Sequence, residues 1–231
     1  MRFLRGEGSA VNATVPIRVW DAPTRLFHWL LVALLGFSWW SAEEEMMDWH
    51  RLSGSIVLGL LMFRIIWGFA GSSTARFANI IRSPIKLVGY LRSGSSSPRI
   101  PGHNPVGGYS VAIMLLLLTV QTGTGLFAVD VDGIESGQLS HLVSFDGGRA
   151  AAEIHEISFT LLQIVVAVHI LAVLFYLLVR KRNLVTPMLT GADRQIDDAR
   201  NALVPASALR FAIAVAIAAG LGWWAAMGFP T

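Results

Sequence analysis

Residues 154–179 read IHEISFTLLQIVVAVHILAVLFYLLV, an apolar run that carries two histidines, His155 and His169. A bilayer core about 30 Å thick needs roughly 20 residues of helix, so this run predicts a membrane-spanning helix. With a rise of 1.5 Å and a turn of 100° per residue, the two histidines lie about 21 Å apart along the helix and only about 40° apart around it. One helix face therefore presents two ligands at two depths.

Four further apolar runs, at residues 26–42, 52–70, 109–129 and 206–229, predict four more spans. The composition agrees, because 54% of residues are hydrophobic and only 14% are charged, which is outside the range of soluble domains. We predict an all-α integral membrane protein with a four-helix bundle in residues 1–191. A linker and a fifth C-terminal transmembrane helix follow in residues 192–231. No separate apolar run precedes residue 26, so we expect the first span to act as its own insertion signal.

The charges between the runs separate by sign. Basic residues gather before residue 26, in 71–108 and after 179, whereas acidic residues dominate 43–48 and 130–153. The positive-inside rule then predicts a multi-pass protein of the bacterial inner membrane with a cytoplasmic N-terminus and a periplasmic C-terminus. The net charge of +3 forms no basic stripe with interleaved aromatic residues, so we expect no nucleic-acid partner. Residues 83–92 predict a short interfacial helix, and 130–153 either a partner-docking surface or a solvated loop.

Histidine is costly inside a membrane span and is a functional candidate by default. Four histidines lie in or at the edge of spans, and the predicted topology pairs His50 with His155 on the outer side and His28 with His169 on the cytoplasmic side. The absence of cysteine excludes iron–sulfur clusters and thioether-linked haem. Zinc or non-haem iron would need three or four ligands at one level. Two histidines per level instead suit two six-coordinate, non-covalent b haems.

Three residues on or beside the face of His50 are further candidates for haem binding. Arg64 follows His50 by fourteen residues, so it shares the face of His50 at the depth of the inner pair. A buried guanidinium needs an anion, which a haem propionate would supply; the alternative is that Arg64 reaches the cytoplasmic interface. Arg51 would serve the outer haem in the same way. Gly54 lets a macrocycle approach closely, although helix packing explains it equally well.

Several motifs resemble the bacterial cytochrome b561 family, which includes the b-type cytochrome subunits of nickel–iron hydrogenases. They are VWDAPTRLFHW at 19–29, His50 with Gly54, RIIWGFAG at 64–71, GHNPVGG at 102–108, the stretches around His155 and His169, and NLVTPMLTG at 183–191. The resemblance covers residues 18–191. It implies a four-helix protein with two haems, and it assigns His28, His50, His155 and His169 as axial ligands. The fifth span departs from the family pattern.

The resemblance also implies a function. Members of that family pass electrons between a periplasmic redox partner, such as a c-type cytochrome or a hydrogenase-like enzyme, and membrane quinone. We therefore expect an electron-transfer subunit of an oxidoreductase. Trp20, Asp21 and Arg25, beside His28, are candidates for a quinone site, with a helix cap at Asp21 as the alternative. Rival functions are a stand-alone superoxide oxidase that reduces quinone, which the acidic outer face disfavours, and a haem-free membrane anchor, which would leave the four histidines without a reason.

Overall fold

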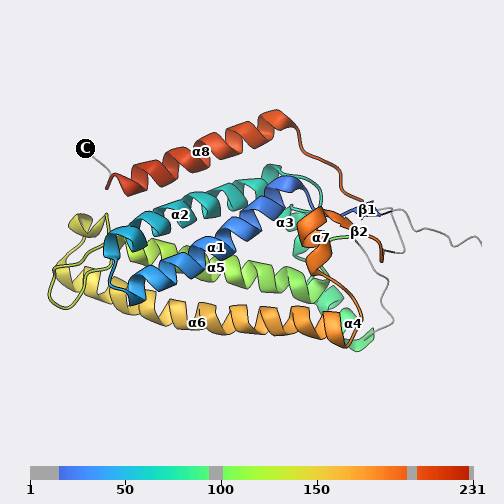
Figure 1. Ribbon diagram of the computed structural model, residues 1–231, viewed down its shortest axis with the longest axis horizontal. Coiled ribbons are helices and arrows are strands. Elements are labelled where there is room, and N and C mark those ends of the chain that lie inside the picture. Colours follow the sequence, from blue (N-terminus) through green and yellow to red (C-terminus); the bar gives the residue numbers. More distant parts are fainter. Residues whose placement is uncertain (1–15, 94–100, 197–201, 229–231) are drawn as a thin grey trace, which may run out of the picture.

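The structure, a computed structural model, describes residues 16–93, 101–196 and 202–228. Four long helices form two antiparallel pairs: α1 (Ala22–Glu43) packs on α2 (Met47–Ala70), and α5 (Pro105–Phe127) packs on α6 (Phe145–Leu178). The two pairs are joined by α2 against α5 rather than by α1 against α6. A fifth long helix, α8 (Ala208–Ala226), lies along α2 (Figure 1). The predicted helical membrane bundle is therefore observed, and α8 lies within the residues predicted to form the fifth transmembrane helix.

Four of the five long helices, α2, α5, α6 and α8, are long and apolar enough to cross a membrane. Helix α1 has sufficient length but is not in this group, because three tryptophans, two serines and His28 lower its hydropathy. Most large apolar side chains of α6 and α8 are exposed at the surface of the molecule. Such exposure is expected of helices that contact lipid. The prediction that residues 26–42 also span the membrane stays a prediction.

The helix starts are set by side-chain caps. Asp21 accepts a hydrogen bond from Thr24 N at the start of α1, and Asn104 accepts one from Gly107 N at the start of α5. Ser144 caps α6 in the same way through Gly147 N. A polar cap satisfies one of the free N–H groups of the first turn. The prediction that the connection from residue 130 extends to residue 153 was wrong, because the cap at Ser144 lets α6 begin at Phe145.

One end of the bundle, which we call the β end, is closed by two segments far apart in the sequence. Strand β1 (Ile17–Arg18) pairs antiparallel with β2 (Ala192–Asp193), which lies in the predicted linker. Between them, the carbonyl of Gly191 accepts hydrogen bonds from Val19 N (2.8 Å) and Trp20 N (3.1 Å). Gly191 has φ +86°, and a Cβ there would lie 2.8 Å from the carbonyl oxygen of Trp20, so only glycine fits.

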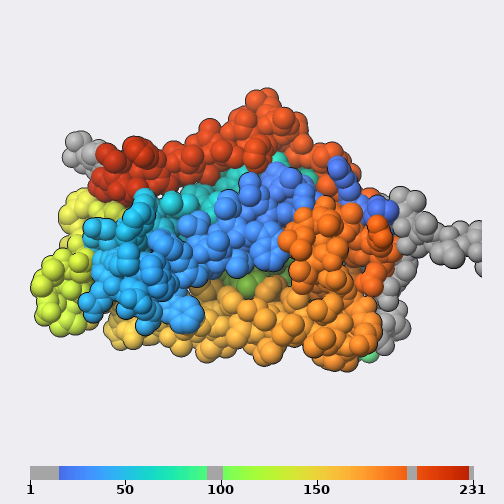
Figure 2. All heavy atoms as spheres, viewed as in Figure 1, coloured from blue at the N-terminus to red at the C-terminus, as the bar shows by residue number. Residues whose placement is uncertain are grey.

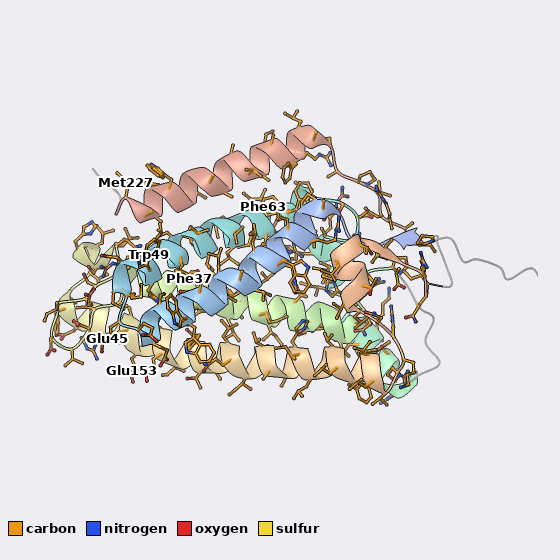
Figure 3. All side chains as sticks on the ribbon, viewed as in Figure 1. Phe37, Glu45, Trp49, Phe63, Glu153 and Met227 are labelled. Carbon is orange, nitrogen blue, oxygen red and sulfur yellow. The ribbon has the colours of Figure 1, made fainter. Side chains whose placement is uncertain are left out.

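Short helices complete both ends. At the β end lie α3 (Phe77–Ile80), α4 (Pro84–Ser93) and α7 (Val185–Thr190), and α4 confirms the helix predicted at 83–92. The opposite end carries the 3₁₀ helix η2 (Ser140–Leu142), and we call it the η2 end. Glu45 and Glu153 lie there (Figure 3).

Helix α8 approaches α2 closely through small residues. Ala214, Ala218, Gly222 and Ala225 are its buried positions, and a Cβ on Gly222 would lie 3.3 Å from Cα of Gly59 on α2. Small residues let two membrane helices pack backbone to backbone. Near the β end, the ring of Phe211 meets Phe63 and Trp67 edge to face, at 6.0 and 5.8 Å.

Candidate functional site

His50 of α2 and His155 of α6 face each other near the η2 end. Their ring centres are 6.1 Å apart and their planes are nearly perpendicular, at 83°. With a metal–nitrogen bond of about 2 Å, two imidazoles on opposite sides of one metal ion have centres about 6 Å apart. The structure thus brings the expected outer pair together at a spacing that suits one axially ligated iron.

Backbone carbonyls of neighbouring helices orient both of these imidazoles. His50 Nδ1 donates to the carbonyl oxygen of Ser38 on α1, and His155 Nδ1 donates to that of Gln121 on α5, each over 2.9 Å. Because a carbonyl can only accept, both protons are placed on Nδ1, which leaves the lone pair of each Nε2 for a metal. This is the arrangement of outer partners that ligating histidines usually have.

Two α5 residues shape the environment of His155. A Cβ on Gly125 would lie 2.8 Å from His155 Cε1, so the ring can pack against α5 only because this residue is glycine. The Gln121 side chain donates from Nε2 to His155 Nε2 over 2.9 Å, while its Oε1 accepts a hydrogen bond from Ser158. Coordination of iron by His155 therefore requires the Gln121 amide to turn away.

The second pair lies towards the β end. His28, in the second turn of α1, and His169 of α6 are close enough for their charges to interact. The His28 ring meets Trp29 edge to face at 4.9 Å. Its Nδ1 is buried and has no hydrogen-bond partner among the described residues. The two histidines thus lie in one electrostatic neighbourhood, and among the described residues neither ring has a carbonyl contact like those of His50 and His155.

Arg64 lies buried at the same depth. It is only 3% exposed, which disagrees with the alternative that it reaches the membrane surface. Its guanidinium lies over the ring of Phe77 at 5.1 Å, and Nη1 has no hydrogen-bond partner in the ranges that the structure describes. The carboxylate of Asp21 is within electrostatic range. Its oxygens already accept from Thr24 N, Trp67 Nε1 and Ser72 Oγ.

His103 also belongs to this site, although it lies outside the predicted spans and is not one of the four histidines that the sequence singles out. Its ring centre is 4.7 Å from that of Trp20, and Arg64, His28 and His169 all lie within electrostatic range of it. Burial lowers the pKa of His103 to about 4, and the positive charge of Arg64 acts in the same direction. The sequence contains a signal for this position, because Asn104-Pro105 is typical of a helix start and so places His103 directly before a span.

The other two haem-binding candidates lie near His50. Arg51 forms ion pairs with Asp48 (2.6 Å) and Glu135 (2.5 Å), so both terminal amines already contact carboxylates. Its role towards a haem stays a prediction. Gly54 lies one turn after His50, and a Cβ there would meet no atom within 4 Å, so open space adjoins α2 at this point.

The three candidate quinone residues gather at the start of α1. Asp21 is the buried cap of the helix, Arg25 donates through Nη1 to the carbonyl of Leu189, and Trp20 contacts His103. For Asp21 the structure therefore shows the capping role that was the alternative. A quinone site at these residues stays a prediction.

These features define a class: a helical membrane protein with paired imidazoles at two depths. The family model for prokaryotic cytochrome b561 matches residues 19–191 of the 231. The chain belongs to this family, as its motifs indicated. Membership implies transmembrane electron transfer through b-type haem. Comparisons with curated proteins and with solved structures gave no match.

The residues present fit a b-type haem, a planar iron macrocycle with two carboxylates. The facing imidazoles would supply nitrogen ligands to the iron, and the buried, unpaired Nη1 of Arg64 would donate a hydrogen bond to a carboxylate. Open space adjoins Gly54, one turn from His50, so a flat group can approach α2 there, and green atoms of α5 are visible between α1 and α6 in Figure 2. Within the described residues, no group of three or more His, Asp or Glu is placed to hold a metal ion.

Proposed function

We propose that this protein carries electrons across the bacterial inner membrane through two b haems, between a periplasmic redox partner and membrane quinone. His50 and His155 ligate one iron, and His28 and His169 the other. The observation that carries the proposal is the facing geometry of His50 and His155, together with the recurrence of histidine fourteen residues further along α6.

When bound, haem supplies a centre that gains or loses one electron. The residues of the chain determine where it sits and how it is surrounded. The two histidines of α6 are separated by about 21 Å along the helix axis, so one helix holds two centres at different depths. The carbonyls of Ser38 and Gln121 fix the imidazole tautomers of His50 and His155, which we call the η2 level; His28 and His169 form the β level. The surrounding apolar helices exclude water and so favour the less charged state of each centre.

The orientation follows from the charges. We place the β end in the cytoplasm, because fifteen of the eighteen basic residues lie in three stretches of sequence: up to the first turn of α1, between α2 and α5, and from the end of α6 to the first turn of α8. All five long helices, α1 included, then span the membrane and leave the C-terminus in the periplasm. The η2 end carries Glu45 and Glu153 among other acidic residues. Such a face suits a basic docking partner, for example a c-type cytochrome, and repels an anion such as superoxide.

For quinone we propose the β end, at Trp20, Asp21 and Arg25. Support comes from position alone: these residues adjoin the His28 level at the start of a membrane helix. Arg25→Ala is the sharpest probe, because Asp21 also holds the fold together through Trp67 and Ser72. We expect slower electron transfer to a water-soluble quinone analogue in this variant, at unchanged haem content. An unchanged rate would contradict a quinone site at these residues.

The purified full chain tests the main proposal. We expect oxidised and dithionite-reduced absorbance spectra of b-type cytochromes and two non-covalent haems per chain. His169→Ala should lose the β-level haem and keep the other, whereas His141→Ala, an exposed histidine of η2, should keep both. A wild-type protein without haem would overturn the proposal. Loss of both haems in His169→Ala would contradict independent sites.

A further inference from the structure

A cluster of buried polar atoms without partners lies beside the His28 and His169 pair. Nη1 of Arg64, Nδ1 of His103 and Nδ1 of His28 are all shielded from solvent and have no hydrogen-bond partner in the described part of the chain. Buried polar atoms are normally satisfied, because an unsatisfied one costs about 1–3 kcal/mol. Three such atoms within one electrostatic neighbourhood point to a group that this chain receives from elsewhere.

The chemistry of these atoms suits a negatively charged group. Arg64 carries a full positive charge that is almost completely buried, and the ion pairs found within the described residues do not include it. The one nearby carboxylate, Asp21, is occupied by a backbone N–H, an indole and a hydroxyl. A buried cation without an anion is strongly unfavourable. The cluster thus has the composition of a carboxylate-binding site.

Two aromatic residues hold the donors in place. Phe77 covers the guanidinium of Arg64, and its ring packs so tightly on Gly68, one turn further along α2, that a Cβ there would lie 2.1 Å from it. Trp20, between β1 and α1, contacts the ring of His103. Two separate parts of the sequence therefore fix one donor each at the same depth.

We propose that His103 acts with Arg64 to bind a propionate carboxylate of the haem that His28 and His169 ligate. A neutral imidazole donates from Nδ1 to the carboxylate, while the guanidinium neutralises its charge. Trp20 and Phe77 are positioning residues. This inference rests on the proposed function, since it needs a haem at the His28 level, and it adds His103 and its aromatic support to the site.

The proposal predicts which haem responds and in which direction. A positive charge beside a propionate favours the reduced iron, because the oxidised centre carries one more positive charge. Arg64→Gln should therefore lower the midpoint potential of the β-level haem. His103→Ala should lower it less, because it removes a neutral donor. The η2-level haem, about 21 Å away along α6, should keep its potential.

Redox titration of the purified, haem-loaded protein followed by absorbance is the test. The two haems are assigned by comparison with His169→Ala. His141→Ala is the matched control for His103→Ala, because it makes the same change at an exposed position of η2. His103→Gln and Arg64→Lys keep a donor and a charge, so both should lie close to wild type. Haem transfer to excess apomyoglobin should be at least about tenfold faster in His103→Ala, because the variant loses one hydrogen bond to a charged group of the haem.

Reconstitution with haem dimethyl ester separates carboxylate binding from a structural role. The ester has no carboxylate. With it, Arg64→Gln and His103→Ala should lower the midpoint potential of the β-level haem less than they do with haem, and the difference between the two variants should disappear. Wild-type potentials in both variants, or equal shifts of both haems, would overturn the inference while the two-haem protein stands. If His103→Ala does not fold, His103→Phe, which keeps a ring against Trp20 but removes the donor, replaces it in the same measurement. A wild-type chain without two haems would instead refute the proposed function itself.

Discussion

The two histidine pairs differ in how far the polypeptide alone satisfies them. At the η2 level, both Nδ1 atoms donate to carbonyls of a neighbouring helix, and the nearby Arg51 is paired with two carboxylates. At the β level, His28 Nδ1 has no partner in the described ranges, and the same is true of one polar atom each in Arg64 and His103. The two sites have similar ligands, but only at the η2 level does the polypeptide itself supply hydrogen-bond partners for the polar atoms around the histidines.

The difference indicates how each level depends on its ligand. Hydrogen bonds to fixed carbonyls orient His50 and His155 before any metal arrives. The β level instead keeps positive and polar groups that a bound anion would satisfy, so ligand binding there should also stabilise the fold. We expect the protein without haem to be less ordered at the β level than at the η2 level, which hydrogen exchange of α1 and α2 would show.

The largest expected effect comes from Gly125→Ala at the η2 level. The new methyl group would lie 2.8 Å from His155 Cε1, so the ring must leave its carbonyl partner, and we expect that haem to be lost. Gly123→Ala is the matched control, two residues away on α5 with no atom within 4 Å of the new Cβ. Haem per chain and the spectrum measure both variants. Full haem content in Gly125→Ala would contradict the packing argument.

A smaller effect is expected from Gly191→Ala at the β end. The left-handed backbone of Gly191 costs a side-chain-bearing residue about 1–2 kcal/mol, and the methyl group would also meet the carbonyl of Trp20. Thermal unfolding should occur at lower temperature, with the β-level haem potential more affected than the other. Gly89→Ala in α4, where the added Cβ meets nothing, should not lower the unfolding temperature.

Gln121→Leu should have a still smaller effect. It removes the amide beside His155 Nε2 but leaves the backbone carbonyl that sets the tautomer, so both haems should be retained. The redox titration should show at most a small shift, confined to the η2-level haem. Gln163→Leu, at an exposed position of α6, provides the comparison. Loss of haem from Gln121→Leu alone would mean that the side chain orients His155.

Arg51→Gln should have the smallest effect on stability. Its two ion pairs are partly exposed to solvent, and pairs of that kind contribute less than about 1 kcal/mol. Unfolding in low and high salt should therefore differ little from wild type. The η2-level potential tests the haem role expected from the sequence: a lower midpoint in Arg51→Gln supports it, and an unchanged one restricts Arg51 to Asp48 and Glu135.

The helices could be predicted from the sequence because apolar runs of membrane length have few alternative structures. The family could be predicted because its motifs surround the histidines, as at residues 19–29. The environment of His103 could not, since Trp20, which contacts it, is 83 positions away and no periodicity links the two. The same applies to Gly191 and Trp20, which meet only through tertiary folding. The start of α6 was missed because a single cap, Ser144, outweighed a polar and glycine-containing stretch.

Helix α8 gives the molecule two unlike sides within the plane of the bilayer. Its small residues seal it against α2, whereas α1 and α6 lie on the other side of α2, and green atoms of α5 are visible between them (Figures 1 and 2). A lipid-soluble molecule that diffuses laterally therefore meets two closely packed helices on the α8 side, and on the other side it meets α1 and α6, which carry three of the four paired histidines. We therefore expect a membrane-soluble reactant to approach the histidine pairs from the side of α1 and α6 rather than from the side of α8.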